Sequence, residues 1–516
     1  MLDPARDRVP ESLRQSARGA LRGVHAWPRH KDALVLLCLV VLGVLPRLSH
    51  IERTYMLDYH AWRQTDSAAF VHGYLVDSFD PLDPSLDRQP CAEKSAPFGR
   101  VEAELPVVAF MSALPLKLFG VHDASAPYLR AVSIALFALG CIALYFAMLE
   151  LGATVVDARL AVAAFSAAPL SIFFTRSPQP DGQSLSFALG AVWALARYLR
   201  SRRSGDLALL TALTAILLLL KISNAYLGFV MAYMVLSQRS PRELLREWPL
   251  FLCACIACAI AAAWYWHAHS FSWSFGLWTE AKHDRKFADW DQLADPGVWR
   301  VLLGRLTWDI LTVAGCALAA IGLAGRSRVA YVRLALVWFG SAGLFVVLTM
   351  NAQLRHGYYQ LCLIPPAALA QTAGVRVLWA RGGYGRACLL ALVSMHGAIT
   401  TSVLWGSHMH ASTDGPSFFS EEESLYEPIE ALHRFVPRNA RFVTTERDPR
   451  LYWNARRRGY FSDSAKLTDI RACLEGTSGY LLLGPRMRRH LTAKASFKDT
   501  FDEVWRGSSF GLYKQR

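Results

Sequence analysis

Residues 106–120 have the sequence PVVAFMSALPLKLFG, and their relation to the membrane decides the topology of the whole chain. The segment is apolar, but it is only about 15 residues long and Pro115 interrupts it. A helix needs about 20 apolar residues to cross a hydrocarbon core of ~30 Å, so a re-entrant or interfacial position suits this segment better. We expect it to enter the membrane surface without crossing.

The rest of the chain contains apolar blocks of roughly spanning length. The 516 residues are 53% hydrophobic, which excludes a disordered chain, a disulfide-rich secreted module and an ordinary soluble enzyme. The blocks lie at 33–48, 128–149, 159–176, 182–199, 206–220, 222–237, 248–267, 306–325, 330–349, 358–376 and 387–405. The prediction is an all-α polytopic membrane protein with about eleven spans and one re-entrant juxtamembrane segment.

The basic residues between these blocks set the orientation. They are Arg197, Arg200, Arg202, Arg203, Arg239, Arg242, Arg246, Arg326, Arg328, Arg333, Arg376, Arg381 and Arg386. If the N-terminus is cytoplasmic and 106–120 does not cross, all of them lie inside, as the positive-inside rule requires. If 106–120 crosses, all lie outside. The net charge of +14 therefore indicates orientation rather than nucleic-acid binding.

Three regions follow from this topology. Residues 1–32 form a basic cytoplasmic tail, and 33–405 form the transmembrane domain, whose first outer loop is 49–127. Residues 406–516 are predicted to form a small α/β domain on the outer face. The first apolar run has no small-residue cleavage site after it, so it is a retained anchor. We expect a multi-pass protein of the bacterial inner (plasma) membrane with a periplasmic or extracellular C-terminal domain.

Within the last region, residues 440–445 and 479–483 are predicted strands, 427–435 a helix and 510–513 a closing edge strand. Of the ten cysteines, only Cys91 and Cys473 lie in polar stretches. A disulfide between them is chemically allowed, and nothing else in the sequence supports it. The remaining cysteines are interpreted as small hydrophobic residues of the spans. A scaffold or acceptor-docking role suits this domain better than catalysis, because it carries no catalytic signature.

The predicted spans are almost free of charge near their centres, which disfavours an ion-coupled transporter. Ionisable groups gather instead at the outer helix ends and in the first loop, which opens with LDYHAWRQTD at 57–66. Asp58 is the candidate base, with His60, Arg63 and Asp66 as substrate-binding candidates. Arg63 and Asp66 could equally pair with each other at helical i,i+3 spacing.

Other outer turns supply further candidates. Asp181, in the turn RSPQPDG at 176–182, suits either an N-cap or catalysis. The residues proposed to bind substrate are Lys221, Arg355, His356, Tyr358 and Tyr359. Glu104, just before Pro106, is either a helix-start acid or a ligand for a divalent metal (Mg, Mn or Zn). His283 is the second metal-ligand candidate, although its spacing from nearby carboxylates matches no recognised motif.

The combination resembles the GT-C membrane glycosyltransferases of glycosyltransferase family 39, which include protein O-mannosyltransferases and the lipid A aminoarabinose transferase. The resemblance covers most of 33–405 and is most specific at 57–66. It implies that Asp58 and Asp181 match the family's first- and second-loop aspartates, and Glu104 its metal-holding glutamate. Tyr59 and Leu105 depart from the bacterial pattern, which commonly has Glu and Lys there.

The resemblance implies an inverting transfer of a sugar from a polyprenyl-phosphate donor to an acceptor hydroxyl at the outer face. The partners would be that donor, membrane lipids, and a lipid, glycan or protein acceptor, with no nucleic acid. Two alternatives remain: a polysaccharide polymerase or ligase of the O-antigen type, and a lipid-linked sugar flippase or other transporter. The large early loop and the uncharged span centres favour the transferase.

Overall fold

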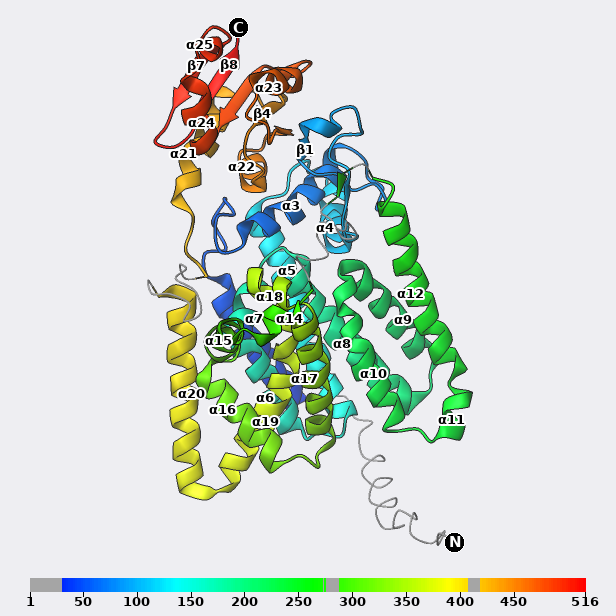
Figure 1. Cartoon of the computed structure of the whole chain (residues 1–516). Helices are drawn as coiled ribbons and strands as arrows, with labels where there is room; N and C mark the ends of the chain where they lie inside the picture. Colours follow the sequence, from blue (N-terminus) through cyan, green and yellow to red (C-terminus); the bar gives the residue numbers. More distant parts are fainter. Residues whose placement is uncertain (1–29, 272, 275–286, 407–417) are drawn as a thin grey trace, which may run out of the picture.

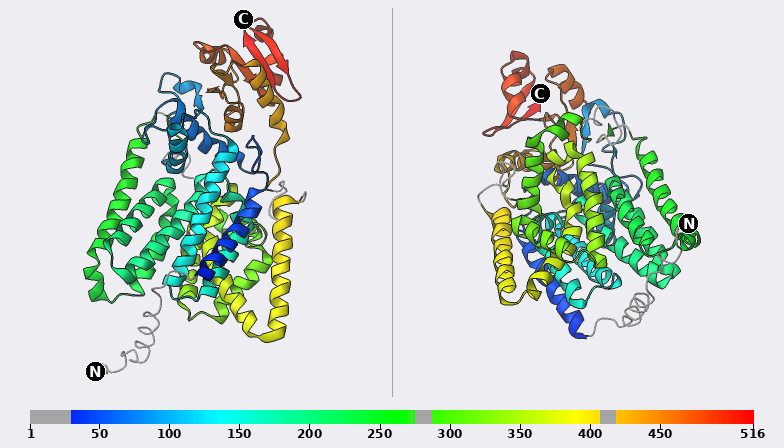
Figure 2. Two further views of the ribbon diagram at one scale, coloured as in Figure 1. Left: turned by 180° about the vertical axis from the view of Figure 1, so that it is seen from behind. Right: turned by 60° about the horizontal axis from the view of Figure 1, so that its bottom comes forward.

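The computed structural model describes residues 30–271, 273–274, 287–406 and 418–516. Most of the predicted 1–32 tail and the candidate ligand His283 lie outside these residues. A helical bundle makes up most of the molecule, and an α/β domain lies at one end of it (Figure 1). Seen from behind, α12 and α20 lie on opposite flanks of the bundle (Figure 2).

The eleven predicted apolar blocks all fall on helices or broken helices of the bundle. The elements are α2 (His30–Val44), η1 (Leu45–Leu48), α5 (Ala126–Glu150), α6 (Val155–Ala167), α7 (Pro169–Phe174), α8 (Pro180–Ser201), α9 (Ser204–Leu220), η3 (Ile222–Tyr226), α10 (Leu227–Leu236), α11 (Pro241–Arg246), α12 (Trp248–Ala268), α14 (Trp290–Ala294), α15 (Pro296–Arg305), η4 (Leu306–Ile310), α16 (Thr312–Gly325), α17 (Ala330–Leu348), α18 (Met350–Arg355), η5 (Gly357–Leu363), α19 (Ile364–Ala380) and α20 (Gly382–Trp405). Among the described residues, five helices are long and apolar enough to cross a membrane, or six if α15–η4 and α16, bent by 94°, form one span. The exact number of spans stays a prediction.

Glycines allow two central helices of the bundle to approach closely. A Cβ atom on Gly322 of α16 would collide with the carbonyl oxygen of Ala370, and one on Gly374 of α19 would collide with that of Leu318. Small residues at helix contacts permit such backbone approach inside membranes. This packing supports the bundle behind the outer loops.

The segment that decides the topology forms the short helix α4 (Val107–Leu118). At 1.5 Å per residue it is ~18 Å long, well short of the ~30 Å needed to cross. It packs on α3 (Ala61–Val76) at the same end of the bundle as the α/β domain (Figure 1). Helix α11, with Arg242 and Arg246, lies at the opposite end (Figure 1).

The C-terminal domain contains a six-stranded sheet with the order β1-β5-β4-β6-β8-β7. The strands are β1 (Arg88–Pro90), β4 (Phe442–Thr444), β5 (Gly459–Phe461), β6 (Tyr480–Leu483), β7 (Phe501–Arg506) and β8 (Gly511–Gln515); the helices are α21 (Tyr426–Phe435), α22 (Pro449–Asn454), α23 (Leu467–Leu474), α24 (Pro485–Thr492) and α25 (Ala495–Lys498). The predicted strands at 440–445 and 479–483 and the helix at 427–435 are present. The edge position of 510–513 was wrong, because β7 pairs with β8 and takes the edge.

One edge strand, β1, comes from the first outer loop rather than from the C-terminal region. It pairs in parallel with β5, with Gln89 opposite Tyr460. The neighbouring Cys91 is disulfide-bonded to Cys473, across 5.4 Å between Cα atoms. Asn454 adds hydrogen bonds of 2.9 and 3.1 Å to the backbone of Met56. These contacts join the first loop to the domain that begins after residue 405. The same loop contains η2 (Cys91–Glu93) and β2 (Val101–Glu102), and β2 pairs with β3 (Trp273–Ser274).

Candidate active site

Asp58 precedes α3 at the end of the bundle that carries the α/β domain, and its side chain is almost completely buried. Its Oδ1 accepts a hydrogen bond of 2.8 Å from Nε2 of Gln64, one turn into α3. Its Oδ2 lies 3.4 Å from Nη2 of Arg176. His60, with a φ of 54°, provides the turn between Asp58 and the helix. The amide and the guanidinium therefore fix the positions of the two carboxylate oxygens.

Arg176 is the main site residue that sequence reasoning missed. It lies 1% exposed at the end of α7, where it also donates to the carbonyl oxygen of Ser49. Its guanidinium carbon is 4.6 Å from the centre of the Phe419 ring. The sequence showed Arg176 in the same turn as Asp181, but 118 residues separate it from Asp58, and no local pattern indicates that pairing.

Asp181 lies in the first turn of α8, where the helix dipole favours a carboxylate. It is not the N-cap, because Gln179 takes that position. Its Oδ1 contacts Nζ of Lys221, which ends α9, and both side chains are largely buried. The Lys221 ammonium also lies 3.7 Å from the centre of the Tyr359 ring. The Asp181 carboxylate therefore holds the Lys221 ammonium against the ring of Tyr359.

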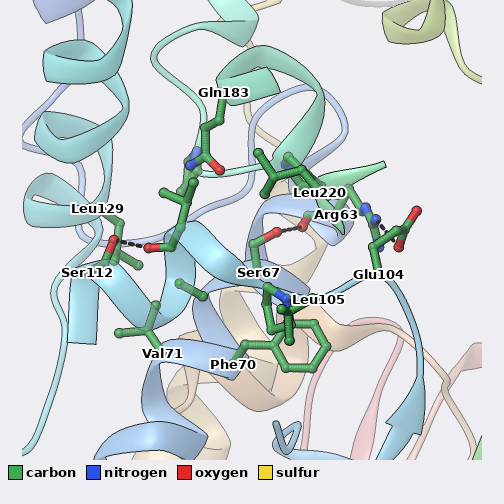
Figure 3. Close-up of a pocket in the computed structure, with 15 residues that line it drawn as sticks. Arg63, Ser67, Phe70, Val71, Glu104, Leu105, Ser112, Leu129, Gln183 and Leu220 are labelled. Atoms are coloured by element: carbon green, nitrogen blue, oxygen red, sulfur yellow. Dashed lines mark hydrogen bonds and ion pairs between the residues drawn. The ribbon is translucent and has the colours of Figure 1, made fainter. Parts of the chain in front are cut away.

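A second ion pair lies beside the first. Nη2 of Arg63 donates to Oε2 of Glu104 at 3.0 Å, and the two side chains point toward one another in Figure 3. Burial by itself would raise the pKa of Glu104, but the charges of Arg63 and Lys221 outweigh burial and lower it. The four charged groups of the two pairs thus form one electrostatic cluster. A small cavity of about 40 Å³ adjoins it between α3, α4 and α8.

Aromatic rings connect Asp58 to this cluster. The ring of His60 lies 5.0 Å from Tyr358 and 5.8 Å from His356, centre to centre. Nζ of Lys221 lies 5.3 Å from the centre of the Tyr358 ring. Burial and the neighbouring cations Lys221 and Arg63 lower the pKa of His356 to about 4, so this imidazole is neutral at pH 7.

Two of the predicted substrate-binding residues, Asp66 and Arg355, are not among the residues that the structure brings together. Both oxygens of Asp66 are engaged by Arg88 of β1, in a pair that is almost fully buried. Asp66 therefore contacts the strand that joins the C-terminal sheet, instead of pairing with Arg63. Arg355 is exposed at the end of α18. The structure brings together Asp58, His60, Arg63, Glu104, Asp181, Lys221, His356, Tyr358 and Tyr359.

A second feature without a sequence signal is the π-helical turn η4, where the chain bends by 94° into α16. It presents Asp309, with Arg305 just before it, and both charges act on the hydroxyl of Tyr59. Arg305 is held by the carbonyl oxygens of Gln353 and Leu354, at 2.6 and 2.9 Å. π-Helical turns occur frequently at functional sites. The sequence reads as the start of a span here and gives no hint of the bend.

Several buried polar atoms around the site have no partner among the described protein groups. They are Gln64 Oε1, Gln179 Oε1 and Nε2, Asp181 Oδ2, His356 Nδ1 and Gln360 Oε1. An unsatisfied buried polar atom costs about 1–3 kcal/mol, so such atoms rarely cluster without a polar ligand or water to bind. They indicate a site for a polyhydroxylated or charged molecule.

The described residues do not fit a divalent metal at Glu104. Among them, no group of three or more His, Cys, Asp or Glu side chains lies close enough together to hold a metal ion. The Glu104 carboxylate is instead held by Arg63. Elsewhere, Oε1 of Glu102 lies 3.1 Å from Nδ1 of His269, and this pair provides two possible metal ligands. No step of the chemistry below is assigned to a metal.

A bundle of apolar helices, a charged first loop with a short juxtamembrane helix, and an α/β domain at one end form a fold that solved structures of GT-C membrane glycosyltransferases share. The comparisons agree, and confirm the resemblance seen in the sequence. The family model described as dolichyl-phosphate-mannose-protein mannosyltransferase matches residues 102–266. That range contains Glu104, Asp181 and Lys221 but not Asp58. No curated protein matches the chain in sequence.

Solved structures share the fold at low sequence identity. ArnT from Cupriavidus metallidurans, bound to undecaprenyl phosphate, superposes with a TM-score of 0.61 at 12% identity, covering 92% of this chain and 97% of that one. Arabinofuranosyltransferase AftD from Mycobacteria superposes with a TM-score of 0.56 at 14% identity, covering 93% of this chain and 40% of that one. The Archaeoglobus fulgidus oligosaccharyltransferase superposes with a TM-score of 0.51 at 10% identity, covering 95% of this chain and 75% of that one.

Proposed function

We propose that the chain is a glycosyltransferase that moves a sugar from a polyprenyl phosphate to an acceptor hydroxyl at the outer face of a bacterial inner membrane. The observation that carries the proposal is the buried Asp58, held by Gln64 and Arg176, at the end of the bundle where the ion pairs Arg63–Glu104 and Lys221–Asp181 lie. The bound undecaprenyl phosphate of the similar ArnT structure supports a lipid phosphate as the leaving group.

The cations suit a departing phosphate. Arg63 has five N–H donors, and its pair with Glu104 uses Nη2, so further donors of the guanidinium remain for phosphate oxygens. Lys221 supplies a point charge whose position Asp181 and Tyr359 fix. Preorganised charge of this kind stabilises the negative charge that develops as the carbon–oxygen bond to phosphate breaks.

Asp58 suits the acceptor side of the reaction. A polyprenyl phosphate leaves as a stable anion, so the reaction requires a base but no general acid. The acceptor oxygen forms a bond to the anomeric carbon, the bond to the phosphate oxygen breaks, and the hydroxyl proton passes to Asp58. Gln64 and Arg176 orient the two carboxylate oxygens for this transfer. Attack opposite the phosphate inverts the anomeric centre.

The test uses the purified full-length protein in nanodiscs with undecaprenyl phosphate that carries a radiolabelled sugar, supplied with membrane glycolipid extract. We expect release of undecaprenyl phosphate coupled to labelling of the acceptor. A polymerase or ligase of the O-antigen type would instead require a lipid pyrophosphate donor. A flippase would move the intact donor between leaflets without breaking it, and that result would contradict the proposal.

A further inference from the structure

A second concave site lies where the first loop meets the linker to the C-terminal domain. It is an open groove of about 620 Å³, in the range of ligand sites. Its lining residues are His50, Arg53, Trp405, Phe419, Ser420, Glu421, Glu423 and Tyr426. Trp405 ends α20, so the groove opens at the level where that helix leaves the bundle.

Aromatic rings and polar groups alternate in this groove, and they are held in place. The indole N–H of Trp405 donates to Oγ of Ser49 at 2.8 Å, and its ring lies 5.4 Å from that of Phe419. The hydroxyl of Tyr426 donates to Oε2 of Glu421 at 2.7 Å. Trp405 remains 40% exposed, so one part of its ring is open to a ligand. Amphipathic aromatic rings provide a large rigid contact surface together with polar edges.

Among its lining residues, the groove has two carboxylates, Glu421 and Glu423, against one guanidinium, Arg53. Arg53 lies 3.6 Å from Glu421, which neutralises it, and Glu423 adds a further carboxylate. Burial and the neighbouring Arg53 lower the pKa of His50, so that it is neutral at pH 7. The groove is therefore neutral to negative, which disfavours a phosphate and suits a hydroxylated or amino-substituted ligand.

Two contacts relate the groove to Asp58. Phe419, which forms its floor, lies under the guanidinium of Arg176, and Arg176 contacts Asp58. The preceding residue, Phe418, accepts a hydrogen bond of 3.3 Å at its carbonyl oxygen from the backbone N–H of Tyr59. Both contacts place the groove next to residues that contact Asp58 or follow it in the chain.

We infer that this groove is the acceptor site and that the acceptor is a neutral or amino-substituted carbohydrate. The inference rests on the proposed function, because it assigns the hydroxyl that Asp58 deprotonates. Aromatic faces contact the sugar rings, while Glu421, Glu423 and Arg53 bind hydroxyl or amino groups. The carboxylates of the groove then disfavour binding of the donor's phosphate on the acceptor side.

The test is binding of the full-length protein in nanodiscs to an array of immobilised neutral, amino-substituted and phosphorylated oligosaccharides. We expect binding to neutral or amino glycans, a loss of at least tenfold in Trp405→Ala, and retention in Trp405→Phe. Tyr384→Ala is the matched control, because Tyr384 is an exposed aromatic residue at the opposite end of α20. Thermal unfolding of each variant shows that it is folded.

Three results would overturn the inference: no glycan binding, binding to phosphorylated glycans alone, or unchanged binding by folded Trp405→Ala. Binding of undecaprenyl phosphate is measured on the same preparations and is expected to be unchanged in Trp405→Ala. Failure of the wild-type protein to bind undecaprenyl phosphate would count against the proposed function. If the protein binds undecaprenyl phosphate normally but binds no glycan on the array, the assignment of the groove as the acceptor site is wrong and the proposed function is unaffected.

Discussion

Nη2 of Arg176 lies 3.4 Å from Oδ2 of Asp58, and both side chains are almost completely buried. The two residues come from different outer turns, and the guanidinium also holds the carbonyl oxygen of Ser49 and the ring of Phe419. Arg176 therefore fixes Asp58 relative to the first span and to the linker before the C-terminal domain. We regard it as a positioning residue for the proposed base.

Replacing Arg176 should damage catalysis more than donor binding. Arg176→Ala leaves the buried Asp58 carboxylate without its charged partner, and breaking a buried pair costs about 3–5 kcal/mol. We expect transfer to fall about 100-fold or more, within the range of general-base effects. Arg176→Lys keeps the charge without the planar fork and should lose less. Steady-state kinetics would show a change in kcat with the KM for donor nearly constant. If Arg176 had a purely structural role, Arg176→Ala and Arg176→Lys would lose transfer activity to the same extent.

Lys221 should act on the donor phosphate. Losing a charge-assisted hydrogen bond costs about 1.5–3 kcal/mol, so Lys221→Gln should weaken undecaprenyl phosphate binding by about 10- to 100-fold. Lys117→Gln is the control, because Lys117 is an exposed lysine in the last turn of α4. Competition binding with a fluorescent polyprenyl phosphate measures both variants. Equal weakening by the two would indicate only general attraction between the protein and an anionic lipid.

The Cys91–Cys473 disulfide should stabilise the contact between the first loop and the C-terminal domain. It joins residues 382 positions apart, and a cross-link typically contributes about 2–4 kcal/mol by restricting the unfolded chain. Cys473→Ser should therefore unfold at a lower temperature than wild type. Cys388→Ser, which removes a free cysteine of α20, should not. Alkylation of Cys91 or Cys473 in the unreduced, denatured protein would show that the bond is absent.

The orientation inferred from charge can be tested by labelling single cysteines in intact cells. Arg242→Cys in α11 should be protected from a membrane-impermeant maleimide, because we place α11 on the cytoplasmic side. Ser496→Cys in α25 should react. Both positions are exposed in the structure. The opposite pattern would mean that the 106–120 segment crosses or that the N-terminus is outside.

Local sequence patterns were enough to predict several features of the fold. The short apolar segment with Pro115 forms the short helix α4, and short runs flanked by turn residues predicted β4 and β6. The carboxylates Asp58, Glu104 and Asp181 were identified because charge is expensive near a membrane, and the structure brings them into one region. These inferences depend on a residue and its near neighbours.

What the sequence could not show depends on contacts between distant segments. The Arg176–Asp58 pair and the addition of β1 to the C-terminal sheet each join residues more than 100 positions apart. Asp66 was taken as a substrate residue because Arg88, its buried partner, comes from a strand without a local pattern. The bend at η4, which brings Arg305 and Asp309 near Tyr59, interrupts a run that reads as a simple span.

The central claim is that Asp58 is the base, and the most direct measurement is single-turnover transfer from radiolabelled undecaprenyl-phosphate sugar by Asp58→Asn. The amide cannot accept the proton, so transfer should be lost while undecaprenyl phosphate binding stays near wild type. Because Arg176 loses its buried counter-charge, the unfolding temperature should fall, and a cooperative thermal transition shows that the variant is folded. Asp80→Asn makes the same change at an exposed position of the same loop and should transfer normally. Transfer by folded Asp58→Asn at the wild-type rate would contradict the account.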